Sequence, residues 1–209
     1  MRRPVDATHV WVRPEDQPEG RLTTAEVTEL SAVTHAGRAA EIRRSRPWAR
    51  AVLAGYLGVD PLTVRFRRGR WGKPYLIGEA LQFNLAHTGR QAVLAVSDRP
   101  VGIDVEPASR DLRAVVRRCA SDRERRRLTD CTGPEAVAVW TLKEAYAKAL
   151  GLGHRLTFAT VETVADPEPG RWSVRGDPAR AIDVRTDVPG HLVAVARSTT
   201  SPVTRVMVS

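Results

Sequence analysis

Residues 92–106 read AVLAVSDRPVGIDVE, and this stretch decides the fold expected for the chain. It predicts two short strands, 92–97 and 101–106, joined by a turn that a proline interrupts. Helical and then strand-like patterns occur both before and after this turn, so two halves are expected to meet there. We therefore predict an α+β fold with mostly antiparallel strands, divided into an N-terminal half, 1–98, and a C-terminal half, 99–209.

Two acidic side chains of the second strand are expected to lie on one face. Side chains alternate along a strand, so Asp104 and Glu106 point the same way, while the apolar residues beside them can be buried. Carboxylates that share a face repel each other unless a cation or a shared proton lies between them. A hard divalent ion such as Mg²⁺ takes oxygen ligands and keeps room for water and phosphate. This segment alone leaves two interpretations open, a magnesium site and a half-exposed strand with solvated acids.

Residues 134–150 read PEAVAVWTLKEAYAKAL and predict the strongest helix of the chain. Pro134 suits the first turn of a helix, and Gly151 suits its C-cap. Glu144 and Lys148 are four residues apart and share a face. A surface Glu–Lys pair is the ordinary interpretation, but this helix is apolar around most of its circumference. Its few charges are therefore expected to point into the molecule.

The remaining elements follow from apolar patterns that Gly and Pro interrupt. The first helix is expected to begin after Thr23 or Thr24, either of which can act as its N-cap. The last dozen residues are rich in Ser, Thr and Val and predict an edge strand or a frayed end. The expected helices cover residues 25–43, 46–57, 110–119 and 121–129, and the expected strands cover residues 9–13 and 64–66 and short runs within 157–196.

The composition is that of an ordinary globular protein, because 42% of the 209 residues are hydrophobic and 27% are charged. No run of 18 apolar residues is present, which argues against a transmembrane helix. No apolar region follows the N-terminal arginines, which argues against a secretory signal. Cys119 and Cys131 lack the spacing of a metal knuckle, and two free thiols fit a reducing compartment. We therefore expect a cytoplasmic protein with no membrane partner.

The basic residues are divided very unevenly between lysine and arginine. The net charge is +9, and only three of the 33 basic residues are Lys, namely Lys73, Lys143 and Lys148. Positive charge attracts an anion, but nucleic acid, a phosphorylated cofactor and an acidic protein all qualify. A chain that otherwise uses Arg needs a local reason for each Lys, and a compact ammonium beside a phosphate is one such reason.

Lys73 lies in a turn, GKP at 72–74, which the segment FNLAHT at 83–88 follows. The proline ring of Pro74 fixes the backbone beside this lysine. His87 follows an apolar run and opens a turn, from which its ring can reach a cleft. A lone His is more often structural than functional, so this signal is weak by itself.

Four segments together resemble the 4'-phosphopantetheinyl transferase superfamily, in its larger, single-chain, surfactin-type branch. They are GKP at 72–74, FNLAHT at 83–88, GIDVE at 102–106 and WTLKEAYAK at 140–148. Their order and spacing fit the family pattern over roughly residues 45–160, and the last two motifs are specific in combination. The resemblance implies two similar α/β halves related by pseudo-two-fold symmetry, an active site at the interface between them, and a monomer.

The resemblance also implies roles in catalysis and metal binding. Asp104, Glu106 and Glu144 would bind Mg²⁺. Glu144 would in addition accept the proton of the attacking hydroxyl, and Lys148 would contact the transferred phosphate.

Coenzyme A is the co-substrate that the resemblance implies. Its adenine end would lie beside Lys73 and Pro74, its phosphates beside His87, and its 3'-phosphate beside an arginine of 43–50. One departure from the family pattern is Ala86, which stands where a serine is usual, so a hydroxyl contact there is lost or is replaced by Thr88. The complete set of residues expected to bind coenzyme A is Arg46, Arg50, Lys73, Pro74, His87, Thr88 and Lys143.

The implied reaction moves 4'-phosphopantetheine from coenzyme A to a serine of an apo acyl or peptidyl carrier protein and releases adenosine 3',5'-bisphosphate. The carrier would belong to a peptide, polyketide or fatty acid synthase, as in secondary metabolism. Residues 110–127 are rich in arginine, and Arg113 and Arg117 share a helical face that would dock an acidic carrier. A solvated arginine-rich helix is the alternative.

Two other functions compete with this interpretation. The positive charge fits a nucleic-acid-binding protein, although no binding motif is present and aromatic residues make up only 5% of the chain. A magnesium-dependent nucleotide hydrolase would use the same acids with water as the nucleophile. The combined motifs favour the transferase, and no nucleic acid is expected as a partner.

Overall fold

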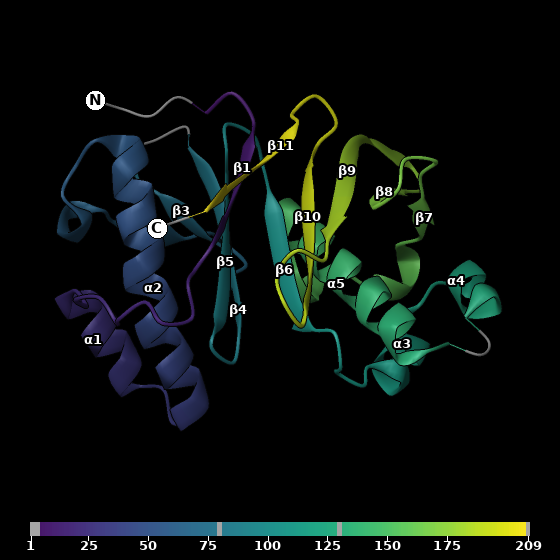
Figure 1. Ribbon diagram of the computed structural model, residues 1–209, viewed down its shortest axis with the longest axis horizontal. Helices are drawn as coiled ribbons and strands as arrows, with labels where there is room; N and C mark the ends of the chain where they lie inside the picture. The colour runs from purple at the N-terminus through teal and green to yellow at the C-terminus, as the bar shows by residue number, and fades with distance from the viewer. Residues whose placement is uncertain (1–4, 79–80, 129–130, 208–209) are drawn as a thin grey trace.

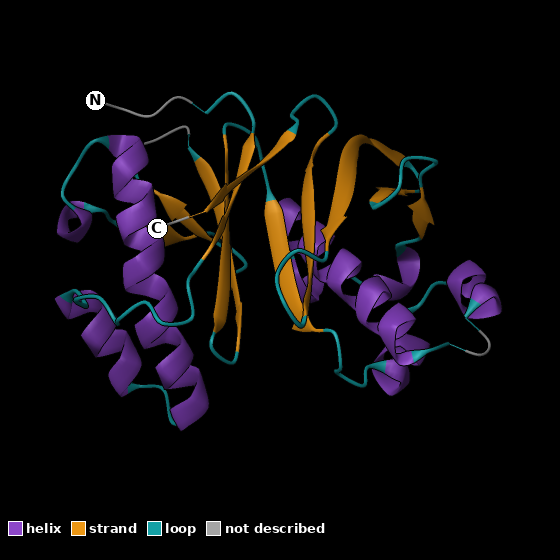
Figure 2. Ribbon diagram, in the orientation of Figure 1, coloured by secondary structure: helices purple, strands orange, loops and turns teal. Residues whose placement is uncertain are grey.

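The computed structural model describes residues 5–78, 81–128 and 131–207, which form four layers (Figure 1). Two sheets pack against each other in the middle, and helices cover the outer face of each sheet (Figure 2). A sheet whose two faces are both covered hides its apolar side chains from water on both sides. The predicted mixed fold with mostly antiparallel strands is confirmed, whereas the pseudo-two-fold relation between the halves stays a prediction.

The first sheet contains a strand from the far end of the chain. β11 (Val203–Met207) pairs in parallel with β1 (Thr8–Val12), which pairs antiparallel with β5 (Gln91–Ser97), and β5 pairs with β4 (Gln82–Thr88). The predicted edge strand near the C-terminus is therefore present. The strands of the second sheet all lie between residues 102 and 198, and β11 joins the first sheet. The predicted division of the chain after residue 98 stays a prediction.

The N-terminal half contains two helices, as expected, but the break between them lies at residues 32–35. Thr23 caps α1 (Thr24–Ser31) through a capping box with Glu26, as the sequence indicates. The next helix, α2, runs over Ala36–Leu57 and ends at Gly58, so the predicted break between 43 and 46 is wrong. Pro47 lies inside α2 and is buried. The second half of α2 packs on the first sheet, and its first half packs on α1 through Ala39 and Ile42, so tertiary packing on both sides of the proline offsets its cost to the helix.

The second sheet has five antiparallel strands, and its edge strand nearest the first sheet is β6 (Gly102–Pro107). Between the sheets, Ile103 and Val105 of β6 meet Val93 and Ala95 of β5 in one apolar cluster. The other strands of this sheet are β10 (His191–Ser198), β9 (Asp177–Arg185), β8 (Arg171–Val174) and β7 (Thr163–Ala165), and a separate pair is formed by β2 (Phe66–Arg68) and β3 (Pro74–Leu76).

The outer face of the second sheet is covered by α5 (Gly133–Leu150). This helix begins with a capping box at Thr132 and ends at Gly151, in agreement with the sequence pattern. The arginine-rich segment forms two short helices, α3 (Arg113–Cys119) and α4 (Asp122–Arg127). Both begin after their predicted starts, and α3 ends at the predicted residue 119, whereas α4 ends before residue 129. α3 packs on the first half of α5. Three short 3₁₀ turns complete the secondary structure, at Pro61–Thr63, Gly153–Arg155 and Phe158–Thr160.

Among the described residues, no helix combines the length and the apolar character needed to cross a lipid bilayer.

Candidate active site

A glycine brings β6 and α5 into direct backbone contact. A Cβ atom on Gly102 would lie 2.0 Å from the carbonyl oxygen of Ala145 and 2.4 Å from the backbone nitrogen of Ala149. No side chain larger than hydrogen fits there while α5 stays in place. Because side chains alternate along a strand, the residues two and four positions after Gly102 face the same helix.

The two acids of β6 both meet side chains of α5. Oδ1 of Asp104 accepts a hydrogen bond from Nζ of Lys148 at 2.5 Å. Oε1 of Glu106 accepts one from Nε1 of Trp140 at 3.0 Å, and its Oε2 binds Arg110 at 2.5 Å. The acidic face of β6 therefore meets the face of α5 that carries Trp140 and Lys148, as the sequence indicates, and both acids are buried.

Glu144 lies between Trp140 and Lys148 on the same face of α5, one helical turn from each. Burial raises the pKa of the Glu144 carboxyl, and the charges of Asp104 and Glu106 raise it further, against the effect of Lys148. The pKa of Asp104 is raised in the same way, by burial and by the charge of Glu106. The three carboxylates are therefore electrostatically coupled, and Glu144 is suited to accept a proton.

These carboxylates fit a hard divalent cation in their donor chemistry. Oδ2 of Asp104 is buried and has no hydrogen-bond partner among the described residues, and the charges of neighbouring acids raise the pKa of Asp104 and of Glu144. Over the described parts of the chain, however, no three acidic, His or Cys side chains form a group arranged to hold a metal ion. Lys148 occupies one oxygen of Asp104, and Glu106 has partners on both of its oxygens. The donors of the predicted magnesium site are present, but a closed set of ligands is not.

Lys73 connects the N-terminal half to α5. Its Nζ donates hydrogen bonds to the carbonyl oxygens of Val101 at 2.8 Å and Lys148 at 2.7 Å. Burial lowers the pKa of Lys73 to about 8, and the charge of Arg180 adds to this effect. The ammonium thus binds the last turn of α5, where a cation is favourable, instead of standing free for a ligand. The predicted place of Lys73 beside an adenine stays a prediction.

A cavity of about 580 Å³ lies in the N-terminal half between α1, α2 and the β2–β3 pair. Pro74 and Arg46, two of the residues predicted to bind coenzyme A, line it. The guanidinium of Arg46 is bound by Glu29, which also binds Arg68, and these hydrogen bonds lower the pKa of Glu29 to about 2. An anion at Arg46 would therefore compete with Glu29.

Arg50 does not have the predicted position of a phosphate ligand. Its side chain is 2% exposed, and its guanidinium binds both carboxylate oxygens of Glu26 at 2.5 Å and the carbonyl oxygen of Arg21. A buried guanidinium with these partners cannot reach a ligand without breaking an ion pair. Arg50 instead attaches α2 to the start of α1.

The FNLAHT segment lies in β4, and the two faces of this strand contact different parts of the protein: one faces the second sheet and the other faces α2. Asn84 and Ala86 face the second sheet, where Oδ1 of Asn84 accepts a hydrogen bond from the backbone nitrogen of Ile103 at 2.8 Å. Ala86 is buried in the apolar cluster between the sheets, so a serine hydroxyl there would lie in an apolar environment. Thr88 ends the strand and is half-buried.

His87 faces α2 and is surrounded by positive charge. Its Nδ1 lies 3.3 Å from a carboxylate oxygen of Glu41. Burial lowers the pKa of the His87 ring, and the charges of Arg38, Lys148 and Arg46 lower it further, against the effect of Glu41. Cationic side chains from both halves thus act on one ring, which marks a favourable place for an anion at the junction of the halves.

Lys143 does not lie where a coenzyme A ligand must lie. Its side chain is fully buried, and its Nζ binds Glu124 and three backbone carbonyl oxygens. This nitrogen has no exposed surface to offer to a phosphate, so its predicted role in binding is wrong.

Three residues of this region were missed by the sequence reasoning. Gly102 and Asn84 set how β6 packs, and Arg38 contributes to the positive charge around His87. A glycine on the same strand face as two acids was a usable signal, because it permits a close approach of another backbone. Asn84 lies in the FNLAHT motif, although no role was assigned to it, and Arg38 had no distinguishing pattern.

Comparison with known proteins identifies the family. Residues 100–196 match a family model described as the 4'-phosphopantetheinyl transferase superfamily. The 4'-phosphopantetheinyl transferase HetI of Nostoc sp. is 36% identical over 167 residues, which cover 71% of this chain and 70% of that protein. The chain belongs to the 4'-phosphopantetheinyl transferase superfamily. The transferase is thus an enzyme of the kind that the four motifs indicate.

Two Bacillus subtilis relatives place the transferase in the surfactin-type branch. One, a 4'-phosphopantetheinyl transferase, is 31% identical over 109 residues, and the other, Sfp, is 28% identical over 110 residues. Each match covers 50% of this chain and 49% of the relative, so these similarities extend over about half of each protein.

Proposed function

We propose that this transferase moves the 4'-phosphopantetheine group of coenzyme A to a serine of an acidic apo carrier protein and releases adenosine 3',5'-bisphosphate. One observation carries the proposal. Three coupled carboxylates and Lys148 lie between β6 and α5, and Lys148 is within electrostatic range of His87 from the other half. Acids that can accept a proton and cations that can hold phosphate are what the displacement requires.

In the proposed step, the serine oxygen of the carrier forms a bond to the phosphorus atom attached to the pantetheine. The bond from that phosphorus to the oxygen of the leaving bisphosphate breaks, and the serine proton passes to Glu144. Lys148 and His87 neutralise the charge that builds up on the phosphates. A bound Mg²⁺, held by Asp104, Glu106 and Glu144, would supply further neutralisation of the pyrophosphate.

The direct test is a mass measurement on the carrier. The protein is incubated with coenzyme A, Mg²⁺ and several apo acyl and peptidyl carrier proteins, and the phosphopantetheine adduct on the serine is sought. An adduct together with stoichiometric adenosine bisphosphate is the expected result. Turnover of coenzyme A that does not depend on a carrier would instead identify a hydrolase, and no adduct with any carrier would contradict the proposal.

Magnesium binding can be tested without turnover. We expect Mg²⁺ to raise the melting temperature of the wild-type protein by about 5 °C once its concentration exceeds the dissociation constant roughly a hundredfold. Asp104→Asn should abolish this shift, because the unpartnered buried oxygen lies on Asp104. Asp98→Asn, at an exposed turn, is the matched control and should keep it. An equal shift in the Asp104 variant would place the ion elsewhere.

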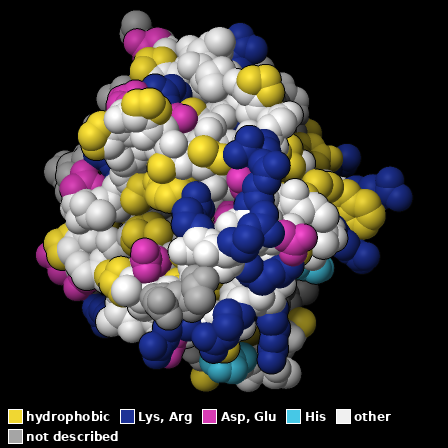
Figure 3. All heavy atoms as spheres, turned by 90° about the vertical axis from the view of Figure 1, so that its right-hand side faces the viewer, with side chains coloured by type: hydrophobic (Ala, Val, Ile, Leu, Met, Phe, Trp, Pro, Cys, Tyr) yellow, Lys and Arg dark blue, Asp and Glu magenta, His cyan; other side chains and the backbone are white. Residues whose placement is uncertain are grey.

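The arginine-rich segment is the proposed docking surface for the carrier. Its exposed arginines lie on α3 and α4, and Figure 3 shows a dense band of basic side chains on the side of the molecule that carries these helices. The segment begins beside the site, since Arg110 binds Glu106. Arg113 is paired with Asp111, whereas Arg117 has no carboxylate within ion-pair distance among the described residues. Arg117 is therefore the better probe of the two.

We expect Arg117→Glu to raise the KM for an acidic carrier about tenfold and to leave the KM for coenzyme A unchanged. The glutamate of the variant would repel the negative charges of the docking carrier. Arg99→Glu makes the same charge change at the exposed β5–β6 turn and should have little effect. Both constants come from initial rates at varied carrier and varied coenzyme A. A carrier KM that moves equally in the two variants would show that only the net charge matters.

A further inference from the structure

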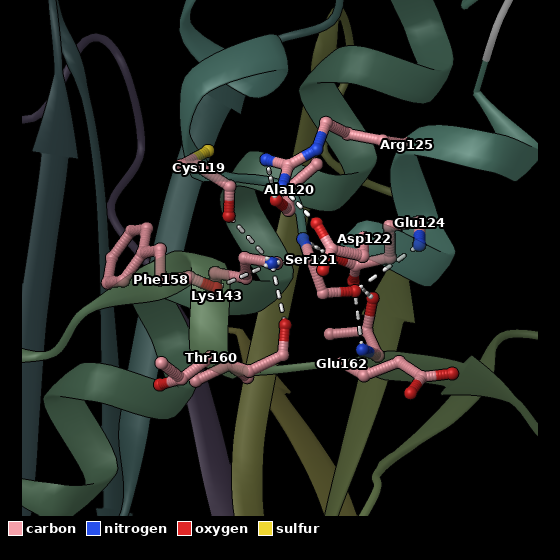
Figure 4. Close-up of polar contacts among 12 residues, drawn as sticks. Cys119, Ala120, Ser121, Asp122, Glu124, Arg125, Lys143, Phe158, Thr160 and Glu162 are labelled. Carbon is pink, nitrogen blue, oxygen red and sulfur yellow. Dashed lines mark hydrogen bonds and ion pairs between the residues drawn. The ribbon is translucent and has the colours of Figure 1, made fainter.

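The most deeply buried ion pair of the C-terminal half lies next to the catalytic residue in sequence but on another side of α5. Nζ of Lys143 lies 2.6 Å from Oε2 of Glu124, and both side chains are fully buried (Figure 4). The same nitrogen donates to the carbonyl oxygens of Cys119 at 2.9 Å, Phe158 at 2.8 Å and Val161 at 2.7 Å. Four acceptors of the protein thus surround an ammonium that has three N–H donors, so no donor is left for a ligand.

Glu124 is equally well bound. Its Oε2 accepts a hydrogen bond from the backbone nitrogen of Ser121 at 2.7 Å, and its Oε1 accepts two from the nitrogen and the hydroxyl of Thr163, at 2.9 and 2.7 Å. Burial acts to raise the pKa of Glu124, but the hydrogen bonds from Lys143 and these groups outweigh it and lower the pKa. The pair thus joins four parts of the chain: α5, the end of α3, the start of α4, and residues 158–163.

Stability alone does not explain such a pair. Removing two charges from water is costly, and an apolar pair of similar volume often stabilises a protein as well or better. What the ion pair adds is a defined geometry, because it is satisfied only when all four segments are in place. The apolar contacts between α3 and α5 would by themselves allow other arrangements, since apolar packing has no direction.

We propose that Lys143 and Glu124 form a positioning pair that fixes the arginine-bearing helices α3 and α4 on the catalytic helix. Consecutive residues of a helix point about 100° apart, so Lys143 holds these helices while Glu144 faces β6. The pair thereby sets the distance between the docked carrier and the reacting groups. This inference rests on the proposed function, and it assigns Lys143 to carrier binding through position and not to contact with coenzyme A.

The test compares wild-type protein with a double variant that carries both Lys143→Met and Glu124→Leu. Both charges are removed together, so no unpaired charge is left in the core. We expect the KM for an acidic apo acyl carrier protein to rise at least about tenfold, while kcat and the KM for coenzyme A stay within about twofold. Tyr146→Phe removes a hydrogen bond to Asp177 from the same helix and is the matched control, which should change none of the three.

A second measurement keeps the inference testable without turnover. Hydrogen exchange is followed at the backbone amides of Arg125 and Leu128, which bond only to backbone oxygens of Ser121 and Glu124. We expect exchange at least about tenfold faster in the double variant than in Tyr146→Phe, because α4 loses its anchor. If the double variant fails to fold, Thr163→Val removes one hydroxyl donor to Glu124 and is measured in its place.

The outcomes separate this inference from the proposed function. Faster exchange with a raised carrier KM supports it. An unchanged carrier KM in a folded variant overturns it, and so does a parallel change of kcat and the KM for coenzyme A, which would show that the pair acts on the reacting groups themselves. If wild-type protein forms no adduct with any carrier, the proposed function fails, and the exchange measurement still decides whether the pair anchors α4.

Discussion

Glu144→Gln is expected to lower the rate of phosphopantetheine transfer by about a thousandfold, the size of a general-base contribution. Glutamine keeps the shape of the side chain but cannot accept the serine proton. It also removes one of three coupled negative charges, so the fold should be retained or slightly stabilised, because the burial that raises the pKa of Glu144 penalises only the charged form.

Single-turnover rates with an apo carrier measure the effect, and circular dichroism with thermal unfolding checks the fold. Glu168→Gln, in the exposed turn between β7 and β8, makes the same chemical change away from the site and should leave the rate unchanged. A Glu144 variant that transfers at more than about a tenth of the wild-type rate would exclude this residue as the base.

Gly102→Ala is expected to lower the free energy of unfolding by about 3 kcal/mol or more, a large share of the stability of a typical domain. The added methyl group would meet backbone atoms of α5 at 2.0 and 2.4 Å, and backbone cannot move aside as the end of a side chain can. The helix must shift away from β6, which also separates Lys148 from Asp104. Transfer should therefore fall even in the fraction that remains folded.

Urea unfolding measures this change, and Gly55→Ala is the matched control. Gly55 lies in α2 with no atom near the place of a Cβ, so alanine there should stabilise the protein by about 0.5–1 kcal/mol. We therefore expect the free energy of unfolding to fall in Gly102→Ala and to rise in Gly55→Ala. A neutral effect at Gly102 would mean that α5 does not press on β6.

The side chains that β6 and α5 turn toward each other were predictable, because the residue repeats of a strand and of a helix determine which side chains share a face. A strand repeats its faces every two residues and a helix about every four, so Asp104 and Glu106 share one face and Glu144 and Lys148 another. The motifs in combination then indicated that these two faces meet. The capping residues of α1 and α5 were predictable for a similar reason, since the hydrogen bonds of a cap are local.

The environment of each lysine was not predictable from its rarity. All three lysines do have a local reason to be lysine, but only Lys148 is paired with a carboxylate of the candidate active site. Lys73 binds two backbone carbonyl oxygens, and Lys143 is buried with Glu124. Their partners lie 15 to 75 residues away along the chain, and no short-range pattern specifies such contacts.

The limits of α2 show the same difference between local and distant information. A proline at position 47 predicts a helix boundary, because it removes a hydrogen bond and crowds the preceding turn. Packing of α2 against the first sheet outweighs this cost, and that packing involves strands formed by residues 8–12 and 82–97. Arg50 has its buried position for a related reason, since Glu26 from the preceding helix binds it.

The pairing of β1 with β11 has a consequence for how the protein is made. The ribosome synthesises β11 long after β1, so β1 lacks one of its two neighbours until residues 203–207 have emerged. Closing so long a loop costs chain entropy, and contacts of this kind form slowly. The N-terminal half is therefore begun early and completed late, and a ribosome that stalls before residue 203 leaves an open strand edge that can pair with another chain.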